Sequence, residues 1–293
     1  MKILITGGTG MLGGQCAKVL ESEHEVLCPE KEELDIVSWD RVIDMFDHIS
    51  PDAVINCAGL TDMEACEDED DYVIKKINVE GPRNLAQASA RFGCKMIHIS
   101  CGHVFDGQKA IPQPYFEDDP LNPTSVYGGS KLESETAIRG NSPNYIIIRS
   151  AWLYDVRGKN FLKTMLSGIL EPGPGGISFP NDHFGSPTWC YRLALQIEEL
   201  LVQGGRGTYH ATSEGYCSRF EMAEYLVSRL GIGVPVSPCR MKDMKGPKRP
   251  ANGLLENRLA KKQGRNVMVG WKEDMDRFLD EFGEIFLREA TGP

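Results

Sequence analysis

Residues 2–13, KILITGGTGMLG, decide the fold of this 293-residue chain. Lys2 to Thr6 predicts a buried strand, and Met11 to Glu21 predicts the helix that follows it. The glycines between them are spaced G-x-x-G-x-x-G rather than G-x-G-x-x-G. Glycine permits a tight turn and lets backbone N–H groups approach a pyrophosphate at the positive end of a helix. The stretch therefore predicts a dinucleotide-binding turn formed by Gly7, Thr9, Gly10, Met11, Leu12 and Gly13.

Short apolar runs and longer amphipathic stretches continue to alternate beyond this turn. We expect strands at residues 25–28, 53–57, 95–100 and 145–149, and helices at 38–48 and 71–92. Ser38 is the expected N-cap of the first of these helices, Pro82 bends the second, and a short extra strand precedes Asp35. Alternation of this kind builds right-handed βαβ units. We therefore expect an α/β fold of the Rossmann type, with a doubly wound parallel sheet.

The character of the sequence changes after about residue 150. Residues 171–176 are rich in Pro and Gly and predict a loop, and helices return at 189–202, 219–230 and 273–288. We expect residues 1–150 to form the dinucleotide-binding Rossmann domain. Residues 151–293 then complete the sheet and form a smaller, helix-rich substrate lobe.

Composition excludes several classes of protein. A net charge of −10 disfavours nucleic acid as a partner, and the one basic run, 242–249, is either a solvated loop or a site for an anionic ligand. Nine cysteines without a CxxC spacing predict reduced thiols rather than disulfides or a zinc ribbon. We find neither a signal-peptide pattern nor an apolar stretch of about 18 residues, and therefore expect a cytoplasmic protein that does not contact a membrane.

The end of the second strand selects the cofactor. An acid at this point would bind the ribose hydroxyls of NAD, but residues 27–31 read LCPEK, with no acid at the strand tip. Lys31 is placed to meet a 2′-phosphate, or it is simply a solvated lysine. The pattern slightly favours NADP(H) over NAD(H), and we expect Asp35 and Ile36 to border the adenine.

Tyr127 and Lys131 are four residues apart and share a face if the segment is helical. A phenol has a pKa of about 10, and a neighbouring ammonium lowers that pKa by favouring the phenolate. The pair is therefore either an acid–base centre or an ordinary pair on a helix surface. Its place downstream of a dinucleotide turn favours catalysis.

Further segments narrow the family. They are VINCAG (54–59), NVEGPRNL (78–85), HIS (98–100), VFDG (104–107), RSAWLY (149–154), NDHFGSPT (181–188), GTYH (207–210) and RPAN (249–252). With the glycine turn and the Tyr–Lys pair, they resemble the dTDP-4-dehydrorhamnose reductase family of the extended short-chain dehydrogenase/reductases. The resemblance runs from residue 1 to about residue 288.

The resemblance implies an enzyme that reduces the 4-keto group of a nucleotide-linked deoxysugar with hydride from NAD(P)H. Tyr127 would deliver the proton, and Lys131 would tune it and hold the nicotinamide ribose. Cys57, Ala58, Gly59 and Ser100 would border the cofactor, and His103, Trp152, Asn181 and Arg249 the substrate. Trp152 is otherwise a core aromatic, and Arg249 a loop arginine. A homodimer is possible; because Gln15 stands near a position where metal-linked family dimers use acids, we expect no metal.

One departure affects the chemistry. The family follows HIS with Thr-Asp-Tyr, whereas this chain has Cys101-Gly102-His103, so a thiol replaces the hydroxyl that bonds the keto oxygen. Ser100 should face away from Cys101, because neighbouring strand residues point to opposite faces. Sugar-nucleotide dehydratases carry Thr-Asp-Glu here, which sets dehydration aside. Two alternatives stay open: a reductase for another nucleotide sugar, and a cofactor-binding regulatory subunit like the beta subunit of methionine adenosyltransferase.

Overall fold

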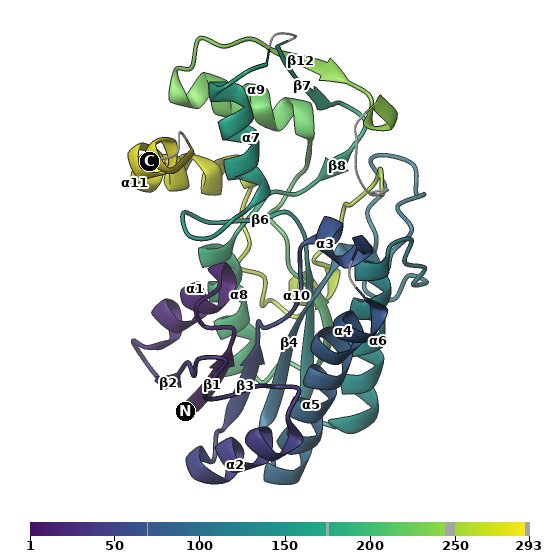
Figure 1. Ribbon diagram of the computed structural model, residues 1–293, viewed down its shortest axis with the longest axis vertical. Helices are drawn as coiled ribbons and strands as arrows, with labels where there is room; N and C mark the ends of the chain where they lie inside the picture. The colour runs from purple at the N-terminus through teal and green to yellow at the C-terminus, as the bar shows by residue number, and fades with distance from the viewer. Residues whose placement is uncertain (69, 174–175, 244–249, 291–293) are drawn as a thin grey trace.

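A single parallel sheet forms the centre of the computed structural model, which describes residues 1–68, 70–173, 176–243 and 250–290 (Figure 1). Its six strands run in the order β10-β5-β4-β3-β1-β2. They are β1 (Lys2–Thr6), β2 (Glu25–Leu27), β3 (Ala53–Asn56), β4 (Lys95–Cys101), β5 (Tyr145–Ser150) and β10 (Gly207–His210). The chain reverses its direction of winding between β1 and β3, and a ligand of a doubly wound sheet binds outside the carboxyl ends of the strands at that point.

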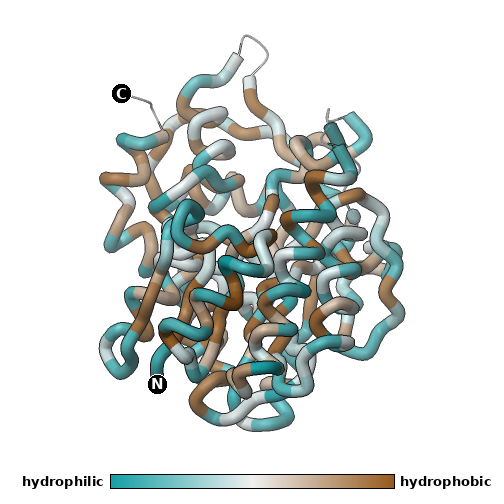
Figure 2. The backbone as a smooth tube through the Cα atoms, turned by 60° about the horizontal axis from the view of Figure 1, so that its bottom comes forward, coloured by the Kyte–Doolittle hydropathy of each residue, from teal (hydrophilic) through white to brown (hydrophobic). Residues whose placement is uncertain are grey.

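Helices cover both faces of the sheet because alternate strand residues point to opposite sides. On one face Ile3 and Ile5 pack with α1 (Met11–Leu20) and α8 (Cys190–Val202). On the other, Leu4 packs with α2 (Trp39–Ile49), α5 (Gly81–Phe92) and α6 (Val126–Asn141). Hydrophobic and hydrophilic residues alternate along the outer helices in Figure 2, as expected for helices that each bury one face.

Two expectations about this half of the chain need correction. No strand forms before Asp35; residues 30–34 turn instead, and the N–H groups of Glu33 and Leu34 donate to the carbonyl of Glu30. β2 is therefore the edge of the sheet. The helix expected at 71–92 is split into α4 (Asp71–Lys75), a π-helical turn η1 (Lys76–Glu80) and α5. Pro82 lies in the first turn of α5, where the missing N–H of proline costs little free energy. The helix is therefore not bent at Pro82, and its irregular segment is η1, which precedes the proline.

A second group of helices lies above the carboxyl edge of the sheet. It contains α7 (Phe161–Leu170), α9 (Arg219–Leu230) and α11 (Trp271–Ala290), which share a hydrophobic cluster that includes Leu166, Met222 and Phe278. Three small two-stranded sheets belong to this half of the chain: β6 (Leu153–Tyr154) with β9 (Thr188–Trp189), β7 (Ile177–Pro180) with β12 (Val236–Cys239), and β8 (Phe184–Gly185) with β11 (Cys217–Ser218). The remaining elements are α3 (Met63–Asp68), η2 (Gly102–Val104), η3 (Met241–Asp243) and α10 (Arg258–Lys262).

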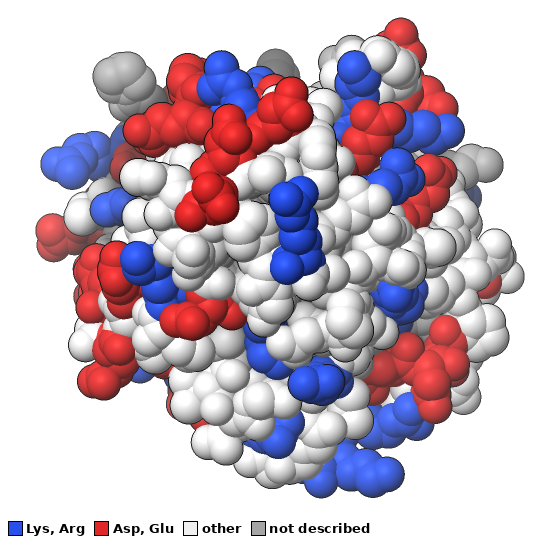
Figure 3. Space-filling view, turned by 90° about the horizontal axis from the view of Figure 1, so that it is seen from below, with Lys and Arg blue, Asp and Glu red and all other residues white. Residues whose placement is uncertain are grey.

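The surface and the helices bear on what the protein contacts. Acidic and basic side chains are interspersed on the face seen from below (Figure 3). Among the described residues, every helix is too short or too polar to cross a lipid bilayer.

Candidate functional site

The glycine turn is built by close backbone contacts. Gly7 has a φ of 71°, and a Cβ there would lie 2.8 Å from the nitrogen of Ala58, in the turn that follows β3. A Cβ on Gly13 would lie 2.1 Å from the carbonyl oxygen of Gly7, so α1 packs directly on the turn. Gly8 was not among the predicted turn residues, yet a Cβ there would lie 2.6 Å from the Cβ of Cys28, just beyond β2. These three glycines make the turn possible.

The N-terminus of α1 is suited to an anion. Gly10 is the N-cap and supplies no side chain to accept from the first-turn N–H groups. Thr9 and Gly10 are exposed, whereas Leu12 is buried in the core and Met11 packs against Gly158. The backbone, rather than the side chains of Met11 and Leu12, is therefore what this turn offers to a pyrophosphate.

The turn after β3 is held beside the glycine turn by buried amides. Asn56 accepts hydrogen bonds from the Thr6 hydroxyl (2.7 Å) and from the N–H of Ala58 (3.1 Å). A Cβ on Gly59 would lie 3.1 Å from Oδ1 of Asn78, which accepts from the N–H of Leu60 (2.8 Å). The backbone of Cys57 and Ala58 thus lies beside the glycine turn, and the π-helical turn η1 places the amide of Asn78 against Gly59.

Only part of the predicted binding site for the adenosine of the cofactor is formed. Lys31 is exposed in the turn beyond β2. Asp35 uses Oδ1 to accept from the N–H of Val37 (3.1 Å). The side chain of Ile36 is buried, and a Cβ on Gly81 would lie 2.6 Å from its Cδ1, so Ile36 packs against α5. Only the backbone of Ile36 therefore remains to border an adenine.

Tyr127 and Lys131 lie on the buried side of α6, and they are not a surface pair. They are 8% and 5% exposed. Ser125 caps the helix by accepting from the N–H of Gly128 (3.1 Å). Gly128 allows the helix to approach η2, since a Cβ there would lie 2.2 Å from the carbonyl oxygen of His103. The absence of a side chain at Gly128 therefore lets α6 bring Tyr127 close to the end of β4.

The environment of Tyr127 keeps its phenol protonated. The phenol donates a hydrogen bond to the thiol of Cys101, and the His103 ring lies edge-on with 5.9 Å between the ring centres. Burial raises the pKa of Tyr127, and Cys101 raises it further. We expected Lys131 to lower this pKa; instead burial dominates, and burial also lowers the pKa of Lys131. The arrangement suits a proton donor rather than a base.

Cys101 and Cys66 pack in the same buried cluster as Tyr127. Both thiols belong to a buried cluster with Tyr127 and Ile74, and burial raises the pKa of Cys101. Cys66, on α3, was not among the predicted site residues, and no spacing in the sequence links residue 66 to residue 127. Contact across α3 and α6 brings them together.

Ser100 faces away from this cluster, as the alternation of strand residues predicts. Its hydroxyl donates to Oε1 of Glu135 (2.6 Å), and Glu135 forms a two-point ion pair with Arg149 at 2.9 and 2.8 Å. The Ser100 hydroxyl is therefore not available to a cofactor or a keto group, and only its backbone remains for the expected cofactor contact.

The predicted substrate residues are found in different settings. Trp152 is half-buried and follows Ser150, which pairs with Cys101 across β4 and β5. His103 lies against Tyr127, at the same edge. Asn181 is exposed in the turn after β7, and its N–H donates to the carbonyl of Cys239 (3.1 Å). Arg249 lies outside the described residues.

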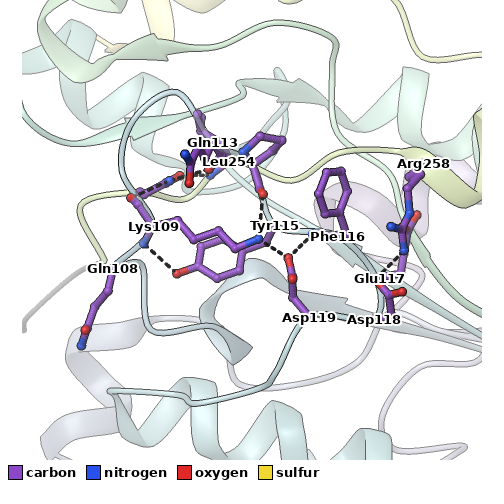
Figure 4. A network of polar contacts seen from close by, with 12 residues as sticks. Gln108, Lys109, Gln113, Tyr115, Phe116, Glu117, Asp118, Asp119, Leu254 and Arg258 are labelled. Atoms are coloured by element: carbon purple, nitrogen blue, oxygen red, sulfur yellow. Dashed lines mark hydrogen bonds and ion pairs between the residues drawn. The ribbon is translucent and has the colours of Figure 1, made fainter.

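A polar network fixes the loop that leaves β4 (Figure 4). Lys109 forms an ion pair with Asp119, and the Tyr115 hydroxyl donates to Oδ1 of Asp106 (2.6 Å). The amide of Asn252 donates to the carbonyls of Lys109 (3.0 Å) and Gln113 (2.8 Å). Residues 252–256 are thereby held against this loop, next to η2.

The comparisons agree with this geometry. The family model for the RmlD substrate binding domain matches residues 1–284. The spore coat polysaccharide biosynthesis protein SpsK of Bacillus subtilis is 34% identical over 285 residues, covering 96% of this chain and 97% of SpsK. The dTDP-4-dehydrorhamnose reductase of Burkholderia thailandensis is 31% identical over 290 residues, covering 93% and 96%. The crystal structure of dTDP-4-dehydrorhamnose reductase from Bacillus anthracis in complex with NADP is 33% identical, with a TM-score of 0.90 and coverage of 96% and 99%. The glycine turn, the buried Tyr–Lys pair and these similarities show that the chain belongs to the dTDP-4-dehydrorhamnose reductase family of NAD(P)-dependent oxidoreductases.

Proposed function

We propose that this protein reduces the 4-keto group of dTDP-4-dehydrorhamnose to give dTDP-rhamnose. The observation that carries the proposal is the buried phenol of Tyr127, which packs in one cluster with Cys101 at the carboxyl end of β4. The glycine turn at the end of β1 lies at the switch point of the same sheet edge. A proton donor and a dinucleotide turn on one edge are what a ketone reductase needs.

The residues at the carboxyl edge of the sheet fit a dinucleotide, and each has a separate role in the proposed reaction. The uncapped N-terminus of α1 would bind its pyrophosphate, and Lys131 its nicotinamide ribose. When bound, the cofactor supplies the hydride. Tyr127 then transfers its phenol proton to the oxygen that was the keto group, and the thiol of Cys101 donates a weaker hydrogen bond to the same oxygen.

The experiment that tests this function pairs a reduction assay with Tyr127→Phe. The parent protein should oxidise NADPH only when dTDP-4-dehydrorhamnose is added, as followed by nicotinamide absorbance. Tyr127→Phe keeps the ring and removes the proton, so turnover should fall by about 10²- to 10⁴-fold while NADPH still binds. Near-normal turnover of the variant would remove Tyr127 from the mechanism. A parent that binds NADPH but reduces no nucleotide sugar would favour a regulatory role.

NADP(H) is the cofactor we propose, because β2 has no acid at its tip and Lys31 stands exposed just beyond it. The relative from Bacillus anthracis was crystallised with NADP. Lys31→Glu should weaken NADPH binding and leave NADH binding nearly unchanged in a calorimetric titration. A parent protein that strongly prefers NADH would contradict this role for Lys31.

We also propose the setting in which the enzyme works. All nine cysteines are free thiols, which supports a reducing compartment such as the cytoplasm. Residues 1–150 would serve the cofactor and residues 151–293 the substrate, although β10 and α8 return to the sheet. A homodimer remains a prediction that light scattering of the purified protein would test.

A further inference from the structure

The loop that follows β6 lies against the first turn of α1. Gly158 has a φ of 71°, and a Cβ there would lie 2.9 Å from Cγ of Met11. A Cβ on Gly14 would lie 3.9 Å from Nη1 of Arg157 and 3.4 Å from the carbonyl oxygen of Gly8. The guanidinium of Arg157 therefore lies beside the glycine turn and the helix that follows it.

The position of Arg157 along α1 places its charge near the helix N-terminus. The N–H of Gly14 donates to the carbonyl of Gly10 (2.9 Å), so Gly14 lies one helical turn, a rise of about 5.4 Å, beyond the N-cap. Gly10 supplies no capping side chain, and the first turn of α1 contains no acidic residue. A cation beside the positive end of a helix is unfavourable on its own, and an anion bound between them reverses the effect.

Hydrogen bonds at the base of this loop fix its shape. The amide of Asn160 donates to the carbonyl of Asp155 (2.8 Å), and Oδ1 of Asp155 accepts from the backbone N–H of Arg157 (3.2 Å). Asn160 is also the N-cap of α7, so one side chain closes the loop and begins the next helix. The backbone around Arg157 is therefore ordered before a ligand binds, which lowers the entropic cost of binding.

Lys159 extends the same loop towards the segment that follows β3. Its Nζ lies 3.4 Å from Oδ2 of Asp62, and the two side chains are 86% and 50% exposed. An ion pair so exposed contributes little to stability, but it shows how far the loop reaches. Residues 155–160 thus extend from α1 to the segment after β3, and these are the two elements that border the proposed pyrophosphate site.

The side chain of Arg157 is suited to a phosphate. It is exposed, and among the residues that the structure describes none forms a hydrogen bond or an ion pair with its guanidinium. Burial raises the pKa of Asp155, and the charge of Arg157 is only one of the weaker effects that oppose this rise. A planar guanidinium presents its N–H groups as a fork that matches two phosphate oxygens.

We propose that Arg157 binds the pyrophosphate of the NAD(P) cofactor, with residues 155–160 closing one side of the site. This inference rests on the proposed cofactor site at the glycine turn. It adds a side-chain charge to the backbone N–H groups of α1, from a residue outside the sequence motifs. It also gives the C-terminal half of the chain a contact with the cofactor in addition to its proposed contacts with the substrate.

The test compares Arg157→Met with Arg206→Met. Arg206 is also exposed, but it precedes β10 and so lies at the opposite, amino-terminal edge of the sheet. Calorimetry would measure the binding of NADPH and of NADH to both variants and to the parent. Arg157→Met should weaken both cofactors by about 10- to 100-fold, the usual effect of losing a charge-assisted hydrogen bond, because both carry the pyrophosphate. Arg206→Met should match the parent.

Several results would overturn the inference and leave the proposed function intact. Parent-like affinity of Arg157→Met for both cofactors would remove Arg157 from the site. A loss confined to NADPH would place Arg157 at the 2′-phosphate instead of the pyrophosphate. An equal loss in Arg206→Met would show an effect of net charge rather than of a contact.

Two further outcomes separate the inference from the function and from folding. A parent that binds neither NADPH nor NADH would overturn both proposals, whereas a parent that binds them but reduces no nucleotide sugar would overturn the proposed function alone. If thermal unfolding shows that Arg157→Met does not fold, Arg157→Lys keeps the charge without the planar fork. Arg157→Lys should bind both cofactors more weakly than the parent, and parent-like affinity in it would overturn the inference.

Discussion

Gly128→Ala should displace Tyr127, the proposed proton donor, and so lower turnover, while its effect on the stability of α6 is measured separately. A Cβ at residue 128 would lie 2.2 Å from the carbonyl oxygen of His103, whereas ordinary van der Waals contact begins near 3.4 Å. α6 and η2 must therefore move apart by about 1 Å, the size of shift at which misplaced reacting groups lose roughly 10²-fold in rate. Because Gly128 follows Tyr127 and His103 lies two residues after Cys101, the shift separates these two groups.

The neighbouring Gly129 offers a matched control. A Cβ at that position meets no atom within 4 Å, so Gly129→Ala changes only helix propensity. We expect it to stabilise the protein by up to about 1 kcal/mol and to leave turnover unchanged. In Gly128→Ala the same gain is opposed by an overpacking cost of about 1–3 kcal/mol. Urea unfolding and steady-state reduction of dTDP-4-dehydrorhamnose measure both quantities. Equal turnover in the two variants would refute the argument that Gly128 positions Tyr127.

Three further changes test other parts of the site. Gly10→Val places a side chain at the exposed N-cap of α1, so calorimetry should show a large loss of NAD(P)H affinity with an unchanged circular dichroism spectrum; undiminished binding would contradict the pyrophosphate site. Cys101→Thr restores a stronger donor, and because one oxyanion donor is typically worth about 10²- to 10³-fold in turnover, kcat should rise by part of that factor; a fall would mean that the thiol serves a different sugar. Burial, aided by Arg149, lowers the pKa of His210 from 6.5 to about 3. Between pH 6.5 and about pH 3, His210 is protonated in the unfolded chain but neutral in the folded protein. The contribution of neutral His210 to the free energy of unfolding is therefore complete above pH 6.5, and it falls by roughly 1.4 kcal/mol for each pH unit of acidification in this range. His210→Gln should flatten that slope in urea unfolding, and an unchanged slope would remove His210 as its cause.

Local patterns predicted several elements with correct bounds. β1 coincides with the predicted strand Lys2–Thr6, and α2 is capped by Ser38, whose hydroxyl accepts from the N–H of Arg41. α9 coincides with the predicted helix at 219–230. These segments combine a clear periodicity with a terminal signal, so the sequence alone contains the necessary information.

Other elements depend on contacts that no local pattern reveals. β10 is only four residues long and exists because its backbone pairs with β5. α7, which the sequence analysis did not predict, begins at the N-cap Asn160, whose side chain accepts from the N–H groups of Leu162 and Lys163. The split helix at 71–92 follows from the need to bring Asn78 to Leu60 and to the Ser130 hydroxyl (3.0 Å). Such tertiary requirements override helix propensity.

The replacement at residue 101 is understandable once its surroundings are known. The family pattern alone presents Cys101 as the loss of a donor, whereas the structure places its thiol in a cluster with Cys66, Ile74 and Tyr127. A buried thiol behaves as a small hydrophobic group with weak hydrogen-bonding capacity, so it fits that cluster without the penalty of an unsatisfied hydroxyl. Burial among these groups also keeps the Tyr127 phenol neutral, as a proton donor must be. In the proposed mechanism, the same substitution would therefore weaken one hydrogen bond to the keto oxygen and preserve the proton that completes its reduction.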